Sequence, residues 1–291
     1  MTSAPDAADA PVQPPSLDEP QRLYLELLKR TLTRFVLGQE TWQPVDPPGD
    51  PLKRLLFAPC AALVSAAGLR LARRARFDPA LREEGRDWPA DAETMIGLRR
   101  LDNLEATVVD AVRRGVPGDL VETGVWRGGA VIFMRGVLRA LGDTSRRVWA
   151  CDSFAGLPAP DAGRYPKDAG DPHHTFPQLA VSIDEVRANF ARYGLLDDQV
   201  KLLPGWFRDT LPRAPIERIA VLRLDGDMYE STIVALDSLY PRLSPGGYLI
   251  VDDYGAVPGC REAVDDYRRA HGVHESVHPI DWTGVYWRRR A

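Results

Sequence analysis

The feature that most constrains this chain is an alternation of short apolar runs with helical segments from about residue 93 onward. Strands are expected at 119–122, 147–151, 200–203, 219–224 and 248–251. Helices are expected at about 94–114, 130–141, 182–193 and 229–243. Strands that alternate with helices in this way form a parallel sheet with helices on both faces. The sequence therefore predicts an α/β chain with a doubly wound, mostly parallel, Rossmann-like sheet.

The 291 residues divide into three expected parts. Residues 1–20 hold five prolines and four acidic residues, without the basic and apolar regions of an export signal, and predict a disordered tail. Residues 21–92 predict a helical extension or lid that begins with a helix at 21–37 and includes a proline-rich connector at 42–51. Residues 93–291 predict the α/β domain.

The longest apolar stretch without a charged residue, 55–69, lies inside the extension. Its 15 residues are fewer than the roughly 20 that span a bilayer. Basic residues flank it on both sides, as they do in a helix that lies on a membrane surface. A helix that packs on the α/β domain or on a second subunit is the favoured interpretation, and membrane contact is the alternative.

Charge and cysteine content limit the class of partner and the cellular compartment that the sequence predicts. The formal net charge of -4 argues against nucleic acid as the main partner, because such proteins usually carry a basic excess. Cys60, Cys151 and Cys260 are odd in number and far apart, so they predict neither a disulfide framework nor a CxxC metal site. A reducing cytoplasm fits this cysteine pattern best.

Polar or glycine residues follow each predicted strand, where ligands bind in open α/β sheets. The first such loop begins with Glu122 and is rich in glycine, but it is not the GxGxxG of dinucleotide folds. An acidic residue there would repel a pyrophosphate and suits a ligand with positive charge. S-adenosylmethionine has a sulfonium and an ammonium group and no phosphate. Asp152, after the next strand, is placed to accept hydrogen bonds from ribose hydroxyls, and Trp206 to flank the adenine.

Four aspartates follow two strands that are expected to be neighbours. Asp225 and Asp227 follow the first of these strands, and Asp252 and Asp253 follow the second. Carboxylates so close together repel one another unless a cation neutralises them, and carboxylate oxygens suit Mg²⁺. Neither aspartate cluster contains a Lys or Arg. The other interpretation of Asp227 is an N-cap for the helix at 229–243.

These two predicted sites together indicate a methyl transfer. A hydroxyl acceptor needs help to lose its proton, and a bound cation lowers the pKa of such a hydroxyl and directs it. A nearby carboxylate can then accept the proton. Two neighbouring hydroxyls on one Mg²⁺ would also orient the acceptor toward the methyl group.

Several ordered motifs resemble the macrocin O-methyltransferase family. They are Glu93-Thr-Met-Ile-Gly-Leu, the run 121–129, the run 152–158, the run 205–212, the run 224–232, the run 251–255 and the ending 280–287. The opening 23–30 is similar as well. This resemblance implies a class I S-adenosylmethionine-dependent methyltransferase fold, and an acceptor that is a sugar hydroxyl of a glycosylated secondary metabolite in antibiotic biosynthesis. It also implies subunit contacts made by the N-terminal region, hence a homo-oligomer.

The resemblance also implies roles for individual residues. Asp225, Asp252 and Asp253 would be the Mg²⁺ ligands and Asp227 the general base. His174, or its neighbour His173, would be a second base or an acceptor contact. The S-adenosylmethionine site would be lined by Met95, Glu122, Thr123, Gly124, Asp152, Ser153, Gly205 and Trp206. The segment 47–86 departs from the family pattern, which has a shorter connection there.

Three alternatives remain at this stage. A catechol-type phenolic acceptor would chelate Mg²⁺ equally well, although a phenol has less need of a dedicated base such as Asp227. The Asp225-Gly-Asp227 motif also resembles the DxD of metal-dependent phosphatases and glycosyltransferases, but neither class accounts for the loop 122–129. A protein of this fold that serves only as a scaffold or partner subunit is the non-enzymatic alternative.

Overall fold

A seven-stranded sheet forms the centre of the molecule in the computed structural model, which describes residues 10–14, 16–37, 41–45, 50–69, 71–87, 89 and 91–290. The strand order is β5-β4-β3-β6-β7-β9-β8. The first five strands of this order run parallel, and β9 and β8 extend the sheet in antiparallel fashion. The strands are β3 (Asp119–Thr123), β4 (Val148–Asp152), β5 (Val200–Pro204), β6 (Ile219–Leu224), β7 (Leu243–Val251), β8 (His278–Pro279) and β9 (Val285–Arg288). The predicted doubly wound, mostly parallel sheet is confirmed.

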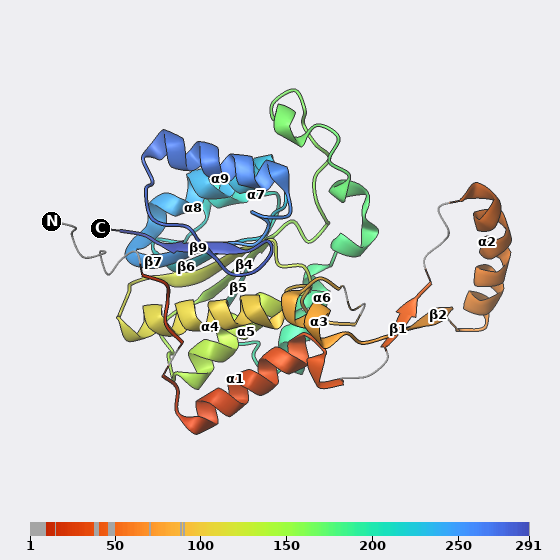
Figure 1. The fold of residues 1–291 in the computed structure, drawn as a ribbon, viewed down its shortest axis with the longest axis horizontal. Helices are drawn as coiled ribbons and strands as arrows, with labels where there is room; N and C mark the ends of the chain where they lie inside the picture. Colours follow the sequence, from red (N-terminus) through yellow and green to blue (C-terminus); the bar gives the residue numbers. More distant parts are fainter. Residues whose placement is uncertain are drawn as a thin grey trace.

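Helices cover both faces of this sheet (Figure 1). One face carries α4 (Leu98–Arg113), α5 (Gly129–Ala140) and α6 (Ile183–Arg192), with α1 (Glu19–Leu32) packed outside α5. The other face carries α8 (Tyr229–Leu239) and α9 (Pro258–His271), with the short α7 (Phe207–Thr210) beside α8. Single 3-10 turns lie at η1 (Phe35–Leu37), η2 (Pro166–Asp168), η3 (His173–Thr175), η4 (Pro177–Leu179), η5 (Leu211–Arg213) and η6 (Tyr240–Arg242).

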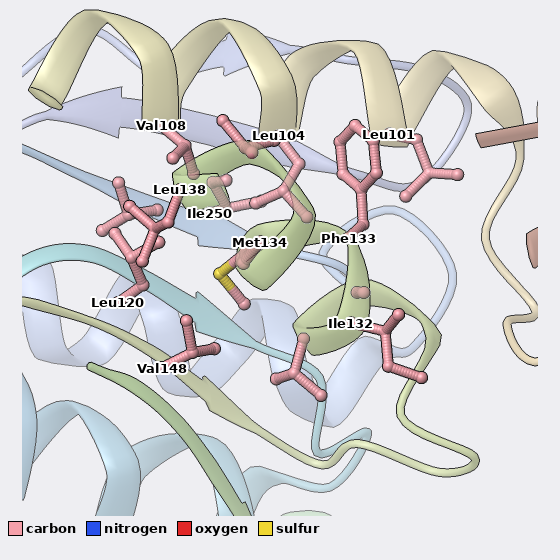
Figure 2. Close-up of a cluster of buried hydrophobic side chains, with 14 of the residues drawn as sticks. Leu101, Leu104, Val108, Leu120, Ile132, Phe133, Met134, Leu138, Val148 and Ile250 are labelled. Carbon is pink, nitrogen blue, oxygen red and sulfur yellow. The ribbon is translucent and has the colours of Figure 1, made fainter. Parts of the chain in front are cut away.

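The larger apolar core lies between the sheet and the α4–α5 face. Figure 2 shows Phe133 and Met134 of α5 meeting Leu104 of α4, with Leu120 and Ile250 of the sheet beside them. These side chains are almost completely buried. Burying a large apolar side chain contributes about 1.5–3 kcal/mol, so this layer holds the strand ends in fixed positions.

The chain reverses its direction of travel across the sheet between β3 and β6. It runs outward from β3 through β4 to β5 and then returns to place β6 on the other side of β3. In open α/β sheets this reversal creates a crevice at the carboxyl ends of the strands, where ligands bind. Gly124 and Asp225 follow the two strands that border this crevice.

The N-terminal extension includes a two-stranded hairpin that the sequence did not predict. β1 (Thr41–Pro44), which overlaps the connector predicted at 42–51, pairs with β2 (Ala72–Ala75). Between the two strands, α2 (Pro51–Ala66) stands away from the sheet and its helices (Figure 1). A short helix, α3 (Pro79–Glu84), follows the hairpin and leads back toward α4.

The apolar stretch 55–69 does form a helix, but α2 does not pack on the α/β domain. Leu52, Leu55, Leu56 and Leu63 are each more than 70% exposed. Within the described residues, no helix is long and apolar enough to cross a membrane. The expectation of packing on the domain of the same chain is therefore wrong, and a second subunit or a membrane surface remains.

Two smaller differences from the predicted organisation concern the segments before α1 and before α4. The described residues before α1, at 10–14 and 16–18, lie against the body, where Val12 N donates to the Tyr286 hydroxyl at 3.0 Å. The helix expected from residue 94 begins at Leu98 instead. The segment 93–97 is therefore outside the helix and lies beside the strand ends.

Candidate active site

Two adjoining cavities lie beyond the carboxyl ends of the strands. The first, here the strand-end cavity, has a volume of about 100 Å³. The second, here the acidic cavity, has a volume of about 430 Å³ and is lined by aspartates of β6 and β7 and by residues 171–173. Residues that line both are Met95, Trp126, Leu179, Asp225 and Asp227.

Asp152 organises the polar side of the strand-end cavity. Its carboxylate accepts hydrogen bonds from Val125 N at 2.7 Å and Phe154 N at 2.8 Å, so it orders the glycine-rich loop as well as its own. Burial raises the pKa of this carboxyl, and these backbone hydrogen bonds act in the opposite direction. Gly205 N donates to the Asp152 carbonyl at 2.9 Å, which ties the loop after β5 to β4.

The remaining walls of this cavity are aromatic and apolar. Trp206, Phe207, Met95 and Leu179 line it, together with Ser153. Aromatic faces of this kind suit a flat heterocycle. Six of the eight residues expected to line an S-adenosylmethionine site surround or support this cavity: Met95, Gly124, Asp152, Ser153, Gly205 and Trp206.

The other two expected residues face elsewhere. Thr123 is buried, its carbonyl accepts a hydrogen bond from Asp225 N, and its hydroxyl has no partner. Glu122 borders the acidic cavity rather than the strand-end cavity. Its Oε2 atom is buried without a hydrogen-bond partner, so this oxygen is available to a ligand.

The acidic cavity gathers three carboxylates from neighbouring strands. Asp225, Asp252 and Asp253 each offer one oxygen, and these oxygens lie within 4.8 Å of one another. Asp227 lies beside them, where its backbone N donates to Asp253 Oδ2 at 3.2 Å. Its φ of +57° is unusual for a residue other than glycine and is typical of functional sites.

Burial and mutual repulsion perturb these acids. The pKa of Asp227 is raised to about 7 by burial and by Asp225, while His173 acts in the opposite direction. The pKa of Asp225 is raised to about 6, by burial and by Asp252. Burial and Asp227 also raise the pKa of Asp253. Carboxyls this crowded are stabilised as anions by a divalent cation, and their hard oxygens suit Mg²⁺.

Two buried arginines neutralise part of this charge, which the sequence interpretation did not include. Arg223 forms ion pairs with Glu122, Asp225 and Asp252. Arg100 of α4 forms ion pairs with Asp252 and Asp281. The absence of Lys and Arg from the two aspartate motifs therefore did not mean that the carboxylates lack a cationic partner. Arg223 lies on β6 two residues before Asp225, and Arg100 comes from α4, so both lie outside the two motifs.

The long loop between β4 and α6 brings one of the two histidines to the site. His173 lines the acidic cavity, and its Nδ1 lies 2.8 Å from Asp171 Oδ1. His174 is exposed, and its Nδ1 lies 3.2 Å from the Asp171 carbonyl oxygen. Of the pair, His173 is therefore the residue placed toward the aspartates.

The same loop provides the cap that Asp227 was considered for. Asp168 accepts hydrogen bonds from Tyr229 N at 2.7 Å and Glu230 N at 2.9 Å, at the start of α8. The N-cap position itself is Met228, which makes no side-chain cap bond. The N-cap interpretation of Asp227 is therefore wrong, because a residue 61 positions away satisfies the helix terminus.

Comparison with known proteins agrees with this geometry. The family model described as Macrocin-O-methyltransferase (TylF) matches residues 21–289. The chain belongs to this family. It is therefore an O-methyltransferase that uses S-adenosylmethionine, and the phosphatase, glycosyltransferase and non-enzymatic interpretations are excluded.

Two curated relatives align over nearly the whole chain. One is 8-demethyl-8-(2,3-dimethoxy-alpha-L-rhamnosyl)-tetracenomycin-C 4'-O-methyltransferase of Streptomyces olivaceus, 50% identical, with 94% of this chain and 95% of the relative covered. The other is mycinamicin III 3''-O-methyltransferase of Micromonospora griseorubida, 48% identical, with 92% and 97% covered. The solved structure of the O-methyltransferase NovP is 46% identical, with a TM-score of 0.79, covering 93% of this chain and all of that one.

Sequence reasoning missed Arg223, Arg100 and Asp168, although one of them left a visible signal. Arg223 interrupts the otherwise apolar strand Ile219–Leu224, and a charge in a central parallel strand is buried on either face. Such a residue must be paired, and the nearby carboxylates are its partners. The roles of Arg100 and Asp168 depend on contacts between distant segments, which leave no local pattern.

Proposed function

We propose that this family member transfers a methyl group from S-adenosylmethionine to a sugar hydroxyl of a glycosylated secondary metabolite, with Mg²⁺ as a required ion, in antibiotic biosynthesis. The observation that carries the proposal is the position of Asp227, which borders both the strand-end cavity and the three-carboxylate cluster. The names of the two relatives support the acceptor class, since one is named for a rhamnosyl tetracenomycin and the other for mycinamicin III.

The strand-end cavity is the proposed cofactor site. Trp206 and Phe207 would contact the adenine, and Asp152 would accept hydrogen bonds from the ribose. Glu122 lines the adjoining acidic cavity, and its buried, unpartnered Oε2 fits the positive charge of a methionine moiety that extends into it. S-adenosylmethionine supplies the methyl group as an electrophilic sulfonium, so these residues need only bind and orient it.

The acidic cavity is the proposed acceptor and metal site. Asp225, Asp252 and Asp253 would hold Mg²⁺, which when bound makes an acceptor hydroxyl more acidic. Asp227 would accept the proton from that hydroxyl as the hydroxyl oxygen bonds to the methyl carbon, while the bond from that carbon to the cofactor sulfur breaks and S-adenosylhomocysteine leaves. His173, rather than His174, would contact the acceptor from the loop above.

Calorimetry of S-adenosylmethionine binding, with Mg²⁺ and in EDTA, tests this proposal together with methylation assays. We expect cofactor binding in both conditions and methylation only with Mg²⁺. Asp227→Asn should reduce kcat at least 100-fold and leave cofactor affinity unchanged, because a general base contributes about 10²–10⁴ in rate. The exposed Asp198→Asn is the matched control. Full activity of Asp227→Asn, or no cofactor binding by the wild type, would overturn the proposal.

We also propose that the enzyme works in the cytoplasm as a homo-oligomer that includes α2. The three cysteines form no disulfide, which fits a reducing compartment. Residues 51–77 contain six basic residues and no acidic one, whereas the whole chain has a net charge of -4. The acidic excess therefore lies elsewhere in the chain. A second copy would offer acidic groups to the arginines of residues 51–77, and the contact would bury the exposed leucines of α2.

A further inference from the structure

Arg223 lies at the point where three neighbouring strands change from apolar to polar on one face of the sheet. Glu122 of β3 is the direct cross-strand partner of Arg223, and Arg223 is the partner of Ile250 on β7. Asp252 follows Ile250 by two positions and Asp225 follows Arg223 by two. Because side chains alternate between faces along a strand, these four charged groups point to the same face.

The guanidinium of Arg223 contacts groups from both proposed ligand sites. Nη1 donates to Glu122 Oε1 and to Asp225 Oδ2, the latter at 2.7 Å. Nη2 donates to Asp252 Oδ1. One side chain therefore touches Glu122, proposed above for the methionine moiety of the cofactor, and two of the three carboxylates of the cation cluster.

Because Arg223 is buried, its charge requires these contacts. Arg223 is 1% exposed, and an arginine cannot shed its charge in a protein interior. Such an ion stays in place only with several well-aligned partners. The planar fork of the guanidinium also fixes the directions of the carboxylates that it binds. A lysine would keep the charge but could not hold three carboxylates in one plane.

We propose that Arg223 is a positioning residue shared by the two sites, which holds Glu122 for the cofactor and Asp225 and Asp252 for the cation. This inference rests on the proposed function. Loss of the guanidinium therefore weakens the binding of both S-adenosylmethionine and Mg²⁺, because the carboxylates proposed for each lose the partner that they share.

Arg100 provides the matched control. It is also a buried arginine that binds Asp252, but its other carboxylate partner is Asp281 and not Glu122. Substitution of Arg100 thus removes a comparable ion pair from the cation cluster while the contact with Glu122 remains.

The test is to titrate Arg223→Lys and Arg100→Lys with S-adenosylmethionine in EDTA, and separately with Mg²⁺, after circular dichroism has shown that each is folded. For Arg223→Lys we expect at least tenfold weaker binding of both ligands. For Arg100→Lys we expect weaker Mg²⁺ binding and a cofactor affinity within twofold of wild type. Cofactor binding of Arg223→Lys within twofold of wild type would overturn the inference, as would equal cofactor losses in both variants.

Glu122→Gln tests the same link without removing the arginine. Without the Glu122 carboxylate the guanidinium loses one of the three partners that fix its orientation, so it holds Asp225 and Asp252 less firmly. Mg²⁺ affinity should therefore fall severalfold although Glu122 is outside the cation cluster. Wild-type Mg²⁺ affinity in this variant would contradict a shared role, even if Arg223→Lys failed to fold. Failure of the wild type to bind S-adenosylmethionine would instead refute the proposed function.

Discussion

Unusual backbone conformations gather where the strands end. Trp126, Phe154 and Asp227 have φ between +48° and +57°. Each comes within three residues of a strand that leads into the site. The apolar layers on both faces of the sheet stabilise these conformations, whose cost is on the order of 1–3 kcal/mol each. At the scale of single residues, therefore, the site depends on backbone geometry as much as on its carboxylates.

Gly124 is the residue for which this dependence is strongest. Its φ is +83°, and a Cβ atom there would lie 1.6 Å from the carbonyl oxygen of Asp225. We expect Gly124→Ala to lower the free energy of unfolding by about 3 kcal/mol or more, through strain and forced separation of β3 from β6. Cofactor binding should be lost with it. Urea denaturation and calorimetry measure the two effects.

Gly142 is a suitable control for Gly124. It also has a positive φ, of +69°, but no atom lies within 4 Å of an added Cβ. Gly142→Ala should therefore cost only about 1 kcal/mol, from the left-handed conformation alone, and cofactor binding should persist. Equal losses of stability in the two variants would show that the close approach to Asp225 does not matter.

At the scale of elements, two adjacent residues, Asp168 and Lys167, hold the loop between β4 and α6, and their contributions to stability differ. Asp168 is buried and caps α8 through two backbone N–H groups. Lys167 pairs with Asp266 and Glu262 of α9 in a more exposed setting. Exposed ion pairs contribute little to stability, whereas a capping carboxylate contributes about 1 kcal/mol. Asp168 is therefore the main polar tie between this loop and α8.

Asp168→Ala should accordingly lower the free energy of unfolding by about 1–2 kcal/mol, because two N–H groups at the start of α8 lose their acceptor. The same change should raise the KM for the acceptor more than it lowers kcat, since the loop that carries His173 is less firmly held. Lys167→Ala, its neighbour, should change stability by less than about 0.5 kcal/mol. Denaturation and steady-state kinetics of the two variants decide, and a larger effect of Lys167→Ala would refute this account.

At the scale of the whole molecule, α2 is the element whose sequence and surroundings disagree most. Helix-forming apolar residues normally become buried, yet Leu55 and Leu56 are exposed at the end of a hairpin (Figure 1). An exposed apolar patch of this kind usually marks an interface. The homo-oligomer proposed above would bury this patch.

Replacing Leu55 and Leu56 together by Glu should convert the oligomer to a smaller species in size-exclusion chromatography with light scattering. Leu27→Glu, on the outer side of α1 and 61% exposed, is the control and should leave the mass unchanged. Dissociation by Leu27→Glu alone would place the interface elsewhere. A monomeric wild type that sediments with anionic vesicles would favour the membrane surface instead.

The sequence by itself determined the five parallel strands and the residues that follow them, but not the antiparallel strands β8 and β9 at the edge of the sheet. Short, mostly apolar runs such as Ile219–Leu224, set between helical segments, predict buried strands, and Asp225 and Asp252 follow two of them. Parallel strands bring their carboxyl ends to one edge, so the crevice and its acidic side follow from local pattern and topology. The same holds for Asp152 and the glycine loop.

Only the tertiary structure decided how those groups are balanced and enclosed. The pairing of Arg223 and Arg100 with the carboxylates, the cap that Asp168 gives to α8 and the choice of His173 over His174 all join segments far apart in the chain. The hairpin β1–β2 likewise pairs residues about 30 positions apart across a proline-rich stretch. A local pattern cannot encode such contacts, because they depend on which side chains meet once the core has packed.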